Sequence, residues 1–354
     1  MHVLHVVPTG GWAGTEQMVA NMANRTVEDA RVTVVVREGP NASRSMVRSR
    51  FDPRVEVVFT RKGASPGAQA EDVAARLNGA PDVVHVHLRP GAELARALEL
   101  DAPVIAHLHV RYFSAHFWWT DALVCVSPWQ ARDVPESYRG PVYLVPNWVE
   151  PFEAASERER QQFRQACGVS DRGLLVGAIG RLSEEKAFDI LCRAFSKVAG
   201  QEDRLVIIGD GPCRDELEEI AALDRRIVLA GYRAESRRLL GALDVFASSS
   251  RLESFGMSVL EAMTVGLPIV ATRARGVQDL LDGTSAVLVD IDAADDLAHG
   301  LAVALDDVRR GNRRVTYALD QYDPSTCALQ LRSVYDHLLG RSPSSDALVR
   351  PGRA

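Results

Sequence analysis

The sequence has few cysteines, no long apolar run and no excess of basic charge, and each shortage excludes a class of protein. Its five cysteines are odd in number and widely scattered, so we expect neither a disulfide framework nor a zinc site. Acidic side chains (47) outnumber basic ones (41), which argues against a nucleic-acid binder. No run approaches the ~18 apolar residues of a membrane span, and the N-terminus lacks the apolar segment of a signal peptide. A cytoplasmic protein is therefore expected.

Short apolar runs alternate with longer amphipathic segments along the whole chain. Because the runs are apolar throughout, they indicate strands buried on both faces, as in a parallel sheet between helices. The length of 354 residues predicts about two domains, so we predict two doubly wound α/β halves. The expected strands are residues 2–7, 31–36, 55–59, 82–87, 103–108, 121–126, 141–145, 173–179, 204–209, 226–231, 244–250, 267–272 and 286–289.

Pro146 and Pro151, followed by a charge-rich segment, mark the junction between the halves. The last residues are rich in Ser, Pro, Gly and Arg, which is typical of a disordered tail. The predicted division is an N-terminal domain over 1–150, a second domain over 151–325, a helix over 326–340 that packs back on the first domain, and a disordered tail over 341–354.

Ligands of doubly wound domains bind at the carboxyl ends of the strands, near helix N-termini. The first strand is followed there by Gly10, Gly11 and Gly14, which permit a sharp turn and a close approach of the backbone to a ligand. The spacing is not G-x-G-x-x-G, so a nicotinamide dinucleotide fingerprint is absent. Taken alone, the glycines are equally typical of an ordinary strand-to-helix turn.

Two cations follow the first strand of the second half. Arg181 and Lys186 lie five residues apart across a strand-to-helix turn, where both can reach a diphosphate, Arg as a fork and Lys as a point charge. Two cations in one loop are, without further evidence, more often part of a solvated surface.

Two glutamates, Glu253 and Glu261, lie on either side of a Phe-Gly step. In one continuous helix they would be ~12 Å apart and on different faces, so they do not form one acid/base pair. We instead expect Glu253 in a loop and Glu261 in the following helix, each binding a hydroxyl pair at one end of a long ligand, such as a ribose and a hexose. The amides of Phe255, Gly256 and Met257 would then face a phosphate or sugar oxygen.

In order and spacing, six motifs resemble the large retaining glycosyltransferase family whose mark is E-x7-E (group 1, family 4 type). The resemblance covers nearly the whole chain. It implies the GT-B fold, in which two Rossmann-like domains face each other across a cleft, with the acceptor on the N-terminal side and the nucleotide-sugar donor on the C-terminal side. The motifs are "GTE" at 14–16, "VPN" at 145–147, "GRLSEEK" at 180–186, "IIGDGP" at 207–212, "SRLESFGMSVLEAM" at 250–263 and "GLPIVAT" at 266–272.

The resemblance also implies roles for the residues singled out above. Glu253 would contact the transferred sugar and Glu261 the ribose of the donor nucleotide. Arg181 and Lys186 would hold the diphosphate, and the backbone from Ser254 to Met257 would contact donor sugar or phosphate.

The family places a histidine after the fifth strand at the reacting sugar. That position falls on His109, and His107, which points the same way from the strand, is the second choice. His85 and His87 are expected to be mainly structural.

The chain departs from the family pattern at three places. Ala187 and Trp148 stand where glycines are usual, and the expected glycine pair near 275–276 is Arg275–Gly276. Arg275 lies near the expected nucleotide cleft, where it either alters the choice of donor or points to solvent.

The tripeptide Asp290–Ile291–Asp292 has the form of the D-x-D motif of metal-dependent sugar transferases. It precedes a terminal helix, and the resemblance implies an ordinary turn and helix cap there. We expect no metal and no other cofactor, because Arg181, Lys186 and helix dipoles supply positive charge to the leaving diphosphate. The implied reaction is transfer of a hexose-type sugar from a UDP-sugar or GDP-sugar to an acceptor hydroxyl, with retention at the anomeric carbon.

The sequence says less about the acceptor than about the donor. Residues 37–62 hold seven basic and three acidic side chains, and "SRSMVRSRF" within them could form a short basic amphipathic helix. Such a helix suits an anionic membrane surface or a lipid-linked acceptor, although a solvated helix face explains it equally well. Trp118 and Trp119 suit a saccharide, a lipid surface or simple packing. These features favour polysaccharide or lipopolysaccharide assembly, peripheral on the inner face of the membrane.

Other functions stay open on the sequence alone. They are a glycosyltransferase acting on a soluble natural product, a nucleotide-sugar epimerase of the same fold, and a non-catalytic subunit that binds a nucleotide-sugar. An epimerase needs several acid/base carboxylates, and only the donor-binding set is visible. The sequence does not specify the sugar, UDP or GDP, the linkage or the oligomeric state.

Overall fold

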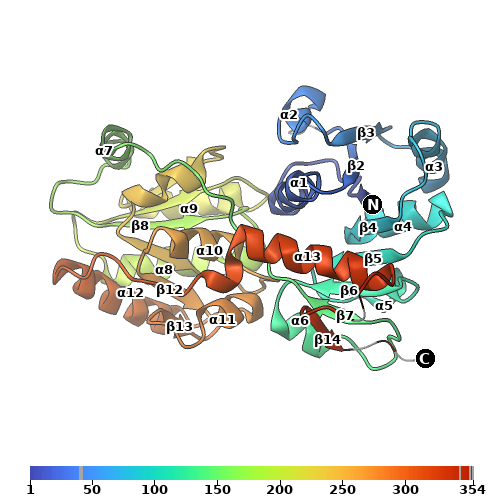
Figure 1. Cartoon of the computed structure of the whole chain (residues 1–354). Helices are drawn as coiled ribbons and strands as arrows, with labels where there is room; N and C mark the ends of the chain where they lie inside the picture. Colours follow the sequence, from blue (N-terminus) through green and yellow to red (C-terminus); the bar gives the residue numbers. More distant parts are fainter. Residues whose placement is uncertain (40–42, 343, 351, 353–354) are drawn as a thin grey trace. The chain divides into compact units, whose positions relative to one another are not determined.

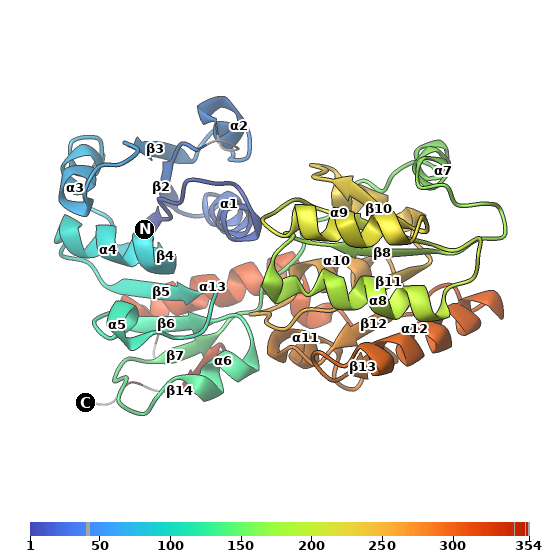
Figure 2. The same ribbon diagram turned by 180° about the vertical axis from the view of Figure 1, so that it is seen from behind.

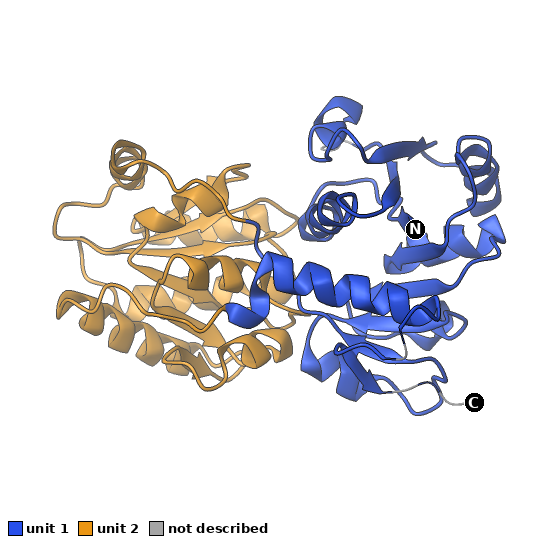
Figure 3. Ribbon diagram, viewed as in Figure 1, with its two compact units in different colours: residues 1–150, 320–354 blue, residues 151–319 orange. Residues whose placement is uncertain are grey.

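The computed structural model describes residues 1–39, 43–342, 344–350 and 352. It divides the chain into two compact units, residues 1–150 with 320–354, and residues 151–319 (Figure 3). The first unit is therefore built from both ends of the chain, and the second from its middle.

The first unit contains a sheet in the order β14-β7-β6-β5-β4-β1-β2-β3 (Figure 1). All neighbouring strands are parallel except β14 and β7, which are antiparallel. The strands are β1 (His2–Val6), β2 (Arg31–Arg37), β3 (Glu56–Thr60), β4 (Val83–His87), β5 (Val104–Leu108), β6 (Ala122–Cys125), β7 (Val142–Leu144) and β14 (Leu348–Arg350).

Helices cover both faces of this sheet because successive strand residues point alternately to each side. On one face, β1 and β4 pack against α3 and α4, and on the other the same strands pack against α1 and α13 (Figure 2). The helices of this unit are α1 (Gly14–Thr26), α2 (Arg44–Arg48), α3 (Pro66–Ala74), α4 (Leu88–Leu98), α5 (Ser114–Phe117), α6 (Pro128–Asp133), the 3-10 turn η3 (Asp320–Tyr322) and α13 (Pro324–Leu338).

The second unit contains a parallel sheet in the order β10-β9-β8-β11-β12-β13. Its main core lies between the sheet and the helices α8, α9 and α12. The elements are α7 (Glu157–Ala166), β8 (Leu175–Ile179), η1 (Glu184–Lys186), α8 (Phe188–Val198), β9 (Arg204–Ile208), α9 (Arg214–Leu223), β10 (Ile227–Gly231), η2 (Ser236–Ala242), β11 (Val245–Ser248), α10 (Met257–Thr264), β12 (Ile269–Thr272), α11 (Arg275–Leu281), β13 (Val287–Val289) and α12 (Ala294–Arg309).

The two α/β sheets, parallel apart from the β7–β14 pair, confirm the predicted fold class, and each of the thirteen expected strands overlaps an observed one. The tail is different from our expectation. Leu348–Arg350 forms a strand against β7, and the neighbouring Ala347 is buried, so the prediction of disorder over 341–354 is wrong there. A short strand with two apolar residues, Leu348 and Val349, inside a polar stretch pairs with the open edge of β7, which composition does not reveal. Residues 343, 351, 353 and 354 lie outside the described residues.

The C-terminal helix α13 contacts α1, and the first unit resumes at Asp320, a few residues before the predicted end of the second domain. Among the described residues, no helix is both long enough and apolar enough to cross a membrane.

Candidate functional site

Two glycine turns meet at the carboxyl edge of the second sheet. A Cβ on Gly209, which follows β9, would lie 1.8 Å from the carbonyl oxygen of Gly180, which follows β8. A Cβ on Gly211 would likewise lie 2.4 Å from the carbonyl oxygen of Leu182. Side chains at 209 and 211 would therefore push the two loops apart, so the glycines hold the loop with Arg181 and Lys186 in place.

Lys186 and Glu253, 67 residues apart in sequence, are brought together at this edge. The Lys186 ammonium donates a hydrogen bond to Oε1 of Glu253, and the hydroxyl of Ser250 donates to the same oxygen at 3.1 Å. Ser249 fixes the lysine backbone by donating its hydroxyl to the Lys186 carbonyl at 2.8 Å. The result is a cation and a carboxylate at the carboxyl ends of β8 and β11.

Gly256 starts helix α10 from a left-handed conformation (φ 102°), which a side chain would strain. The preceding loop packs tightly on α11, because a Cβ on Gly276 would lie 2.5 Å from the carbonyl carbon of Ser254 and 2.6 Å from the amide nitrogen of Phe255. The amide of Gly276 also donates to the carbonyl of Glu253 at 3.1 Å. This packing fixes Glu253 beside the N-terminus of α10, which begins at Met257.

Glu261 lies on α10, separate from the Lys186–Glu253 pair. Desolvation by burial raises the pKa of its carboxyl to about 7, and the charge of Arg237 partly offsets that rise. Within the described chain, its side chain makes no hydrogen bond or ion pair. A partly buried, desolvated carboxyl of this kind is available to a ligand that offers hydroxyl donors.

Arg181 is exposed, and no hydrogen bond or ion pair of its side chain occurs among the described residues. The structure therefore places it in the predicted loop but does not join it to the Lys186–Glu253 pair.

Two of the departures from the family pattern have structural explanations. Ala187 adopts the left-handed conformation (φ 48°, ψ 43°) in which glycine is usual. Trp148 is fully buried in the core of the first unit, where its indole N–H donates to Glu150 at 2.8 Å. At the third place Gly276, rather than residue 275, occupies the position where a Cβ would collide with the loop.

The Asp290–Asp292 tripeptide forms the turn between β13 and α12. Asp292 accepts a hydrogen bond from Nε of Arg251 at 2.6 Å, whereas Asp290 pairs with Arg273 at 3.7 Å. Each carboxylate thus faces a different arginine. Arg251 also donates to the carbonyl of Glu184 at 2.6 Å, so it ties this turn to the η1 loop.

In the first unit, the glycine loop leads from β1 into α1. Glu16 caps the helix by accepting from the amide of Ala13 at 2.9 Å and from the hydroxyl of Thr9. A Cβ on Gly39 would lie 1.5 Å from the carbonyl oxygen of Gly10, so the loop rests directly on the backbone that follows β2.

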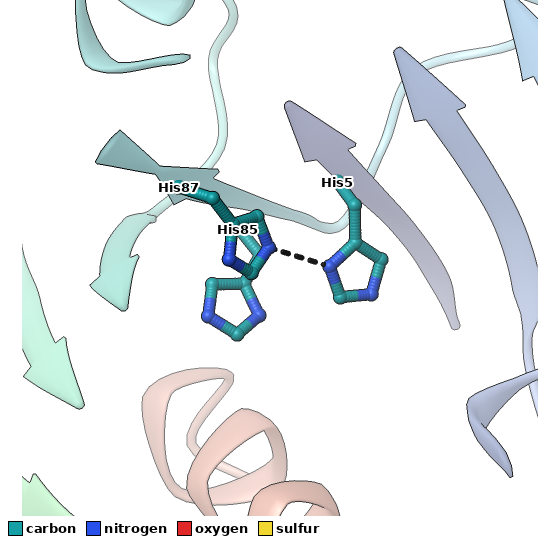
Figure 4. A group of neighbouring side chains, drawn as sticks. All are labelled: His5, His85 and His87. Carbon is teal, nitrogen blue, oxygen red and sulfur yellow. Dashed lines mark hydrogen bonds between the residues drawn. The ribbon is translucent and has the colours of Figure 1, made fainter. Parts of the chain in front are cut away.

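Five histidines line the face of this sheet that α1 and α13 cover. His5 lies opposite His85, and His87 lies opposite His107, in neighbouring parallel strands. Figure 4 shows the rings of His5, His85 and His87 on one side of the sheet. His107 is 1% exposed, whereas His109, just beyond the end of β5, is partly exposed, so His109 is the ring with surface for a ligand.

The imidazoles form two hydrogen-bonded chains. In the first, Nδ1 of His5 bonds Nε2 of His87 at 3.0 Å, and Nδ1 of His87 bonds Nε2 of His109 at 2.9 Å. In the second, the hydroxyl of Tyr335 bonds Nδ1 of His85 at 2.8 Å, and Nε2 of His85 bonds Nδ1 of His107 at 3.3 Å. Burial lowers the pKa of each of these histidines well below its ordinary value, so all five are neutral.

The basic segment is less free than its composition indicates. Helix α2 covers five residues, and Arg44 pairs with Glu38 at 3.0 Å. Arg48 donates to three backbone carbonyls, of which Pro53 is the nearest at 2.9 Å. Residues 40–42 of this segment lie outside the described residues.

Sequence reasoning missed Ser249, Ser250 and Arg251 as residues that position the site. Their signal was the run of serines 248–250 at the carboxyl end of β11, at the edge where ligands bind.

Two family models match the chain and together cover more than half of it. Residues 12–151 match Glycosyltransferase Family 4, and residues 173–307 match Glycosyl transferases group 1. The chain belongs to this glycosyltransferase family. The residues at the edge of the second sheet lie within the group 1 match.

Among curated relatives, the chain is 30% identical over 192 residues to the lipopolysaccharide core biosynthesis glycosyltransferase LpsE of Rhizobium meliloti, covering 53% of this chain and 54% of that protein. It is 27% identical over 313 residues to the alpha-D-kanosaminyltransferase of Streptomyces kanamyceticus, covering 83% and 79%. The match thus spans about half the length of the first relative and about four fifths of the second.

Solved structures share the fold. The Anabaena protein HepE, determined with UDP-glucose, superposes with a TM-score of 0.71 at 21% identity, covering 96% of this chain and 99% of that one. A glycosyltransferase from Rickettsia africae superposes with a TM-score of 0.78 at 15% identity, covering 96% and 99%. At these identities the likeness establishes the fold of two Rossmann-like domains.

Proposed function

We propose that this protein transfers a hexose-type sugar from a nucleoside diphosphate sugar to an acceptor hydroxyl, with retention of the anomeric configuration. The observation that carries the proposal is the edge of the second sheet. There a cation, Lys186, and a carboxylate, Glu253, lie next to helix α10, which starts at a glycine and carries Glu261, a largely desolvated carboxyl that makes no hydrogen bond or ion pair within the described residues. A diphosphate requires a nearby cation such as Lys186. The hydroxyls of the sugar and the ribose can donate hydrogen bonds to the carboxylates of Glu253 and Glu261.

The residues would act as follows. Lys186 and Arg181 bind the diphosphate and stabilise its charge as it leaves, while Glu261 accepts hydrogen bonds from the ribose diol. Glu253 and His109 contact the transferred sugar. The acceptor hydroxyl attacks on the face from which the diphosphate departs, and a diphosphate oxygen takes its proton. The protein supplies position and charge rather than a covalent nucleophile.

We propose that transfer needs no metal, because protein cations supply the charge that a divalent ion would otherwise bring. The engagement of Asp290 and Asp292 with separate arginines supports this. Transfer should survive exhaustive EDTA treatment, and loss that Mn²⁺ restores would refute the proposal.

For the acceptor, we propose a saccharide or lipid-linked saccharide of cell-surface polysaccharide or lipopolysaccharide assembly. The similarity to LpsE supports this class, and the similarity to the kanosaminyltransferase supports a soluble natural product as second candidate. Product analysis after incubation with UDP-sugars and GDP-sugars distinguishes these functions from the other candidates. A new glycoside supports the proposal, an epimerised nucleotide-sugar indicates an epimerase, and tight nucleotide-sugar binding without any product indicates a non-catalytic subunit.

We also propose peripheral attachment of the first unit to the cytoplasmic face of an anionic membrane. Trp118 is 62% exposed and Phe113 is 38% exposed, and both lie in the segment that follows His109. The full chain should sediment with anionic vesicles at low salt, and Trp118→Ser should bind more weakly than Trp119→Ser, because Trp119 is partly buried. A chain that ignores such vesicles at low salt would exclude this attachment.

A further inference from the structure

The chain of imidazoles from His5 through His87 to His109 has a property that single histidines lack. A neutral imidazole carries one N–H and one lone pair, on different nitrogens. His87 uses both of its nitrogens, one toward His5 at 3.0 Å and one toward His109 at 2.9 Å. If His87 donates to one neighbour, it must accept from the other. All protons of the chain therefore point in one direction, either toward His109 or toward His5.

The buried end of the chain decides the direction. Nε2 of His5 is buried and has no hydrogen-bond partner within the described structure. If the protons pointed inward, that nitrogen would carry an N–H with no acceptor, and orphaned buried N–H groups are rare in folded proteins. If they point outward, it carries only an unshared lone pair. Outward polarity places the proton of His109 on Nδ1, the nitrogen that does not bond His87.

We propose that His87 is a positioning residue that fixes His109 as the Nδ1–H tautomer, so that His109 presents a hydrogen-bond donor to an oxygen of its ligand. His109 then donates to a sugar hydroxyl or phosphate oxygen, and it neither gives up nor takes a proton in the reaction. The inference rests on the proposed function in one respect, that His109 contacts the donor sugar.

The same rings have the composition of a metal site, since ring nitrogens of His5, His85 and His87 lie within 4.8 Å of one another. Their nitrogens are already engaged, however. Nδ1 of His5 and Nε2 of His87 bond each other, as the dashed line in Figure 4 shows, and both nitrogens of His85 have partners in the second chain. A shared ion would have to break these bonds, whereas the proton chain uses them as they stand.

The second chain provides the control. His85 is as deeply buried as His87 and lies two residues away on the same face of β4, but it bonds Tyr335 and His107 rather than His109. His85→Phe and His87→Phe each replace a buried imidazole with an apolar ring. Only the second removes the donor to His109. His87→Asn should restore it, because the asparagine amide reaches about where Nδ1 lies.

The test is a long-range ¹H–¹⁵N spectrum of the full chain labelled with ¹⁵N-histidine, which reports the protonated nitrogen of each ring. In the wild type, His109 should carry its proton on Nδ1. His87→Phe should abolish that preference, and His85→Phe and His87→Asn should keep it. With a working donor and acceptor, His87→Phe should lower kcat roughly tenfold, while affinity for UDP or GDP is unchanged, because Lys186 holds the diphosphate.

The outcomes separate this inference from the proposed function. A proton on Nε2 of His109 in the wild type, or equal tautomer populations, overturns the inference even if sugar transfer is observed. Equal effects of His85→Phe and His87→Phe on the His109 tautomer overturn it as well. Absence of transfer to any acceptor refutes the proposed function, and the spectrum still reports the tautomer.

Discussion

The raised pKa of Glu261 predicts that nucleotide binding depends on pH in a defined direction. The carboxyl is about half ionised near pH 7 in the free protein. Only the carboxylate accepts hydrogen bonds with both oxygens from a ribose diol, so we expect binding to select the ionised form. Affinity for UDP or GDP should then fall as the pH drops below 7, by a factor of about ten between pH 8 and pH 6, or about 1.4 kcal/mol.

Isothermal titration calorimetry measures this directly. The terminal phosphate of the nucleotide also titrates in this range, so the control is Glu261→Gln, which shares that contribution but has no carboxyl to ionise. The ratio of the dissociation constants of wild type and Glu261→Gln at each pH isolates the contribution of the Glu261 carboxyl to the pH dependence. Titrations in buffers of different ionisation enthalpy should show release of about half a proton by the wild type near pH 7, beyond the release by the variant.

The same shift has the opposite consequence for folding. A carboxyl whose pKa is raised in the folded state stabilises the protein below its unfolded pKa of about 4.5, and this stabilisation is lost as the pH rises through 7. Unliganded Glu261→Gln should therefore melt at a higher temperature than the wild type at pH 8, although it binds nucleotide more weakly. If the ratio of dissociation constants is the same at pH 6 and pH 8, Glu261 does not bind the ribose as a carboxylate.

Three further predictions concern the second unit. Lys186→Ala should weaken UDP or GDP binding roughly ten- to hundredfold, and Arg181→Ala less, because Arg181 is exposed; unchanged calorimetric affinity in both variants would remove the diphosphate assignment. Glu253→Gln should lower kcat while nucleotide affinity stays equal or rises, because Lys186 no longer shares its charge with the carboxylate; a raised donor KM with normal kcat would argue against contact with the transferred sugar. Ala187→Gly should stabilise the protein by about 0.5–1 kcal/mol and raise Tm by about 2 °C, since glycine relieves a left-handed alanine; a lower Tm in calorimetry would contradict that reasoning.

The strands were predictable because a strand buried on both faces of a parallel sheet is a nearly continuous apolar run, as the buried residues 32–36 of β2 ("VTVVV") show. Strand β14 was not, since three residues carry no periodic signal and depend on the free edge of β7. The same limit applies to Trp148, whose place in the core depends on packing from several elements.

The candidate site was predictable residue by residue but not as a set of contacts. The spacing placed Lys186 and Glu253 near ligand-binding edges, yet their direct bond depends on how two distant loops meet. His85 and His87 were expected to be mainly structural. Sequence alternation shows that they share a face, but the cross-strand register that lines them up with His5 and His107 is a property of the sheet.

The first unit completes its core with a helix, α13, that is synthesised only after the whole second unit. Leu331 and Tyr335 of α13 pack on Val3 and Met18, near the other end of the chain. At 5–20 residues per second, a ribosome needs roughly 10–40 s to proceed from residue 150 to the end of α13 at Leu338. During that interval the nascent first unit exposes the apolar face that α13 will cover, together with the histidines beneath it. The second unit is contiguous in sequence and can finish folding earlier. The first unit, whose synthesis begins earlier, is therefore completed later and depends on a chaperone for longer.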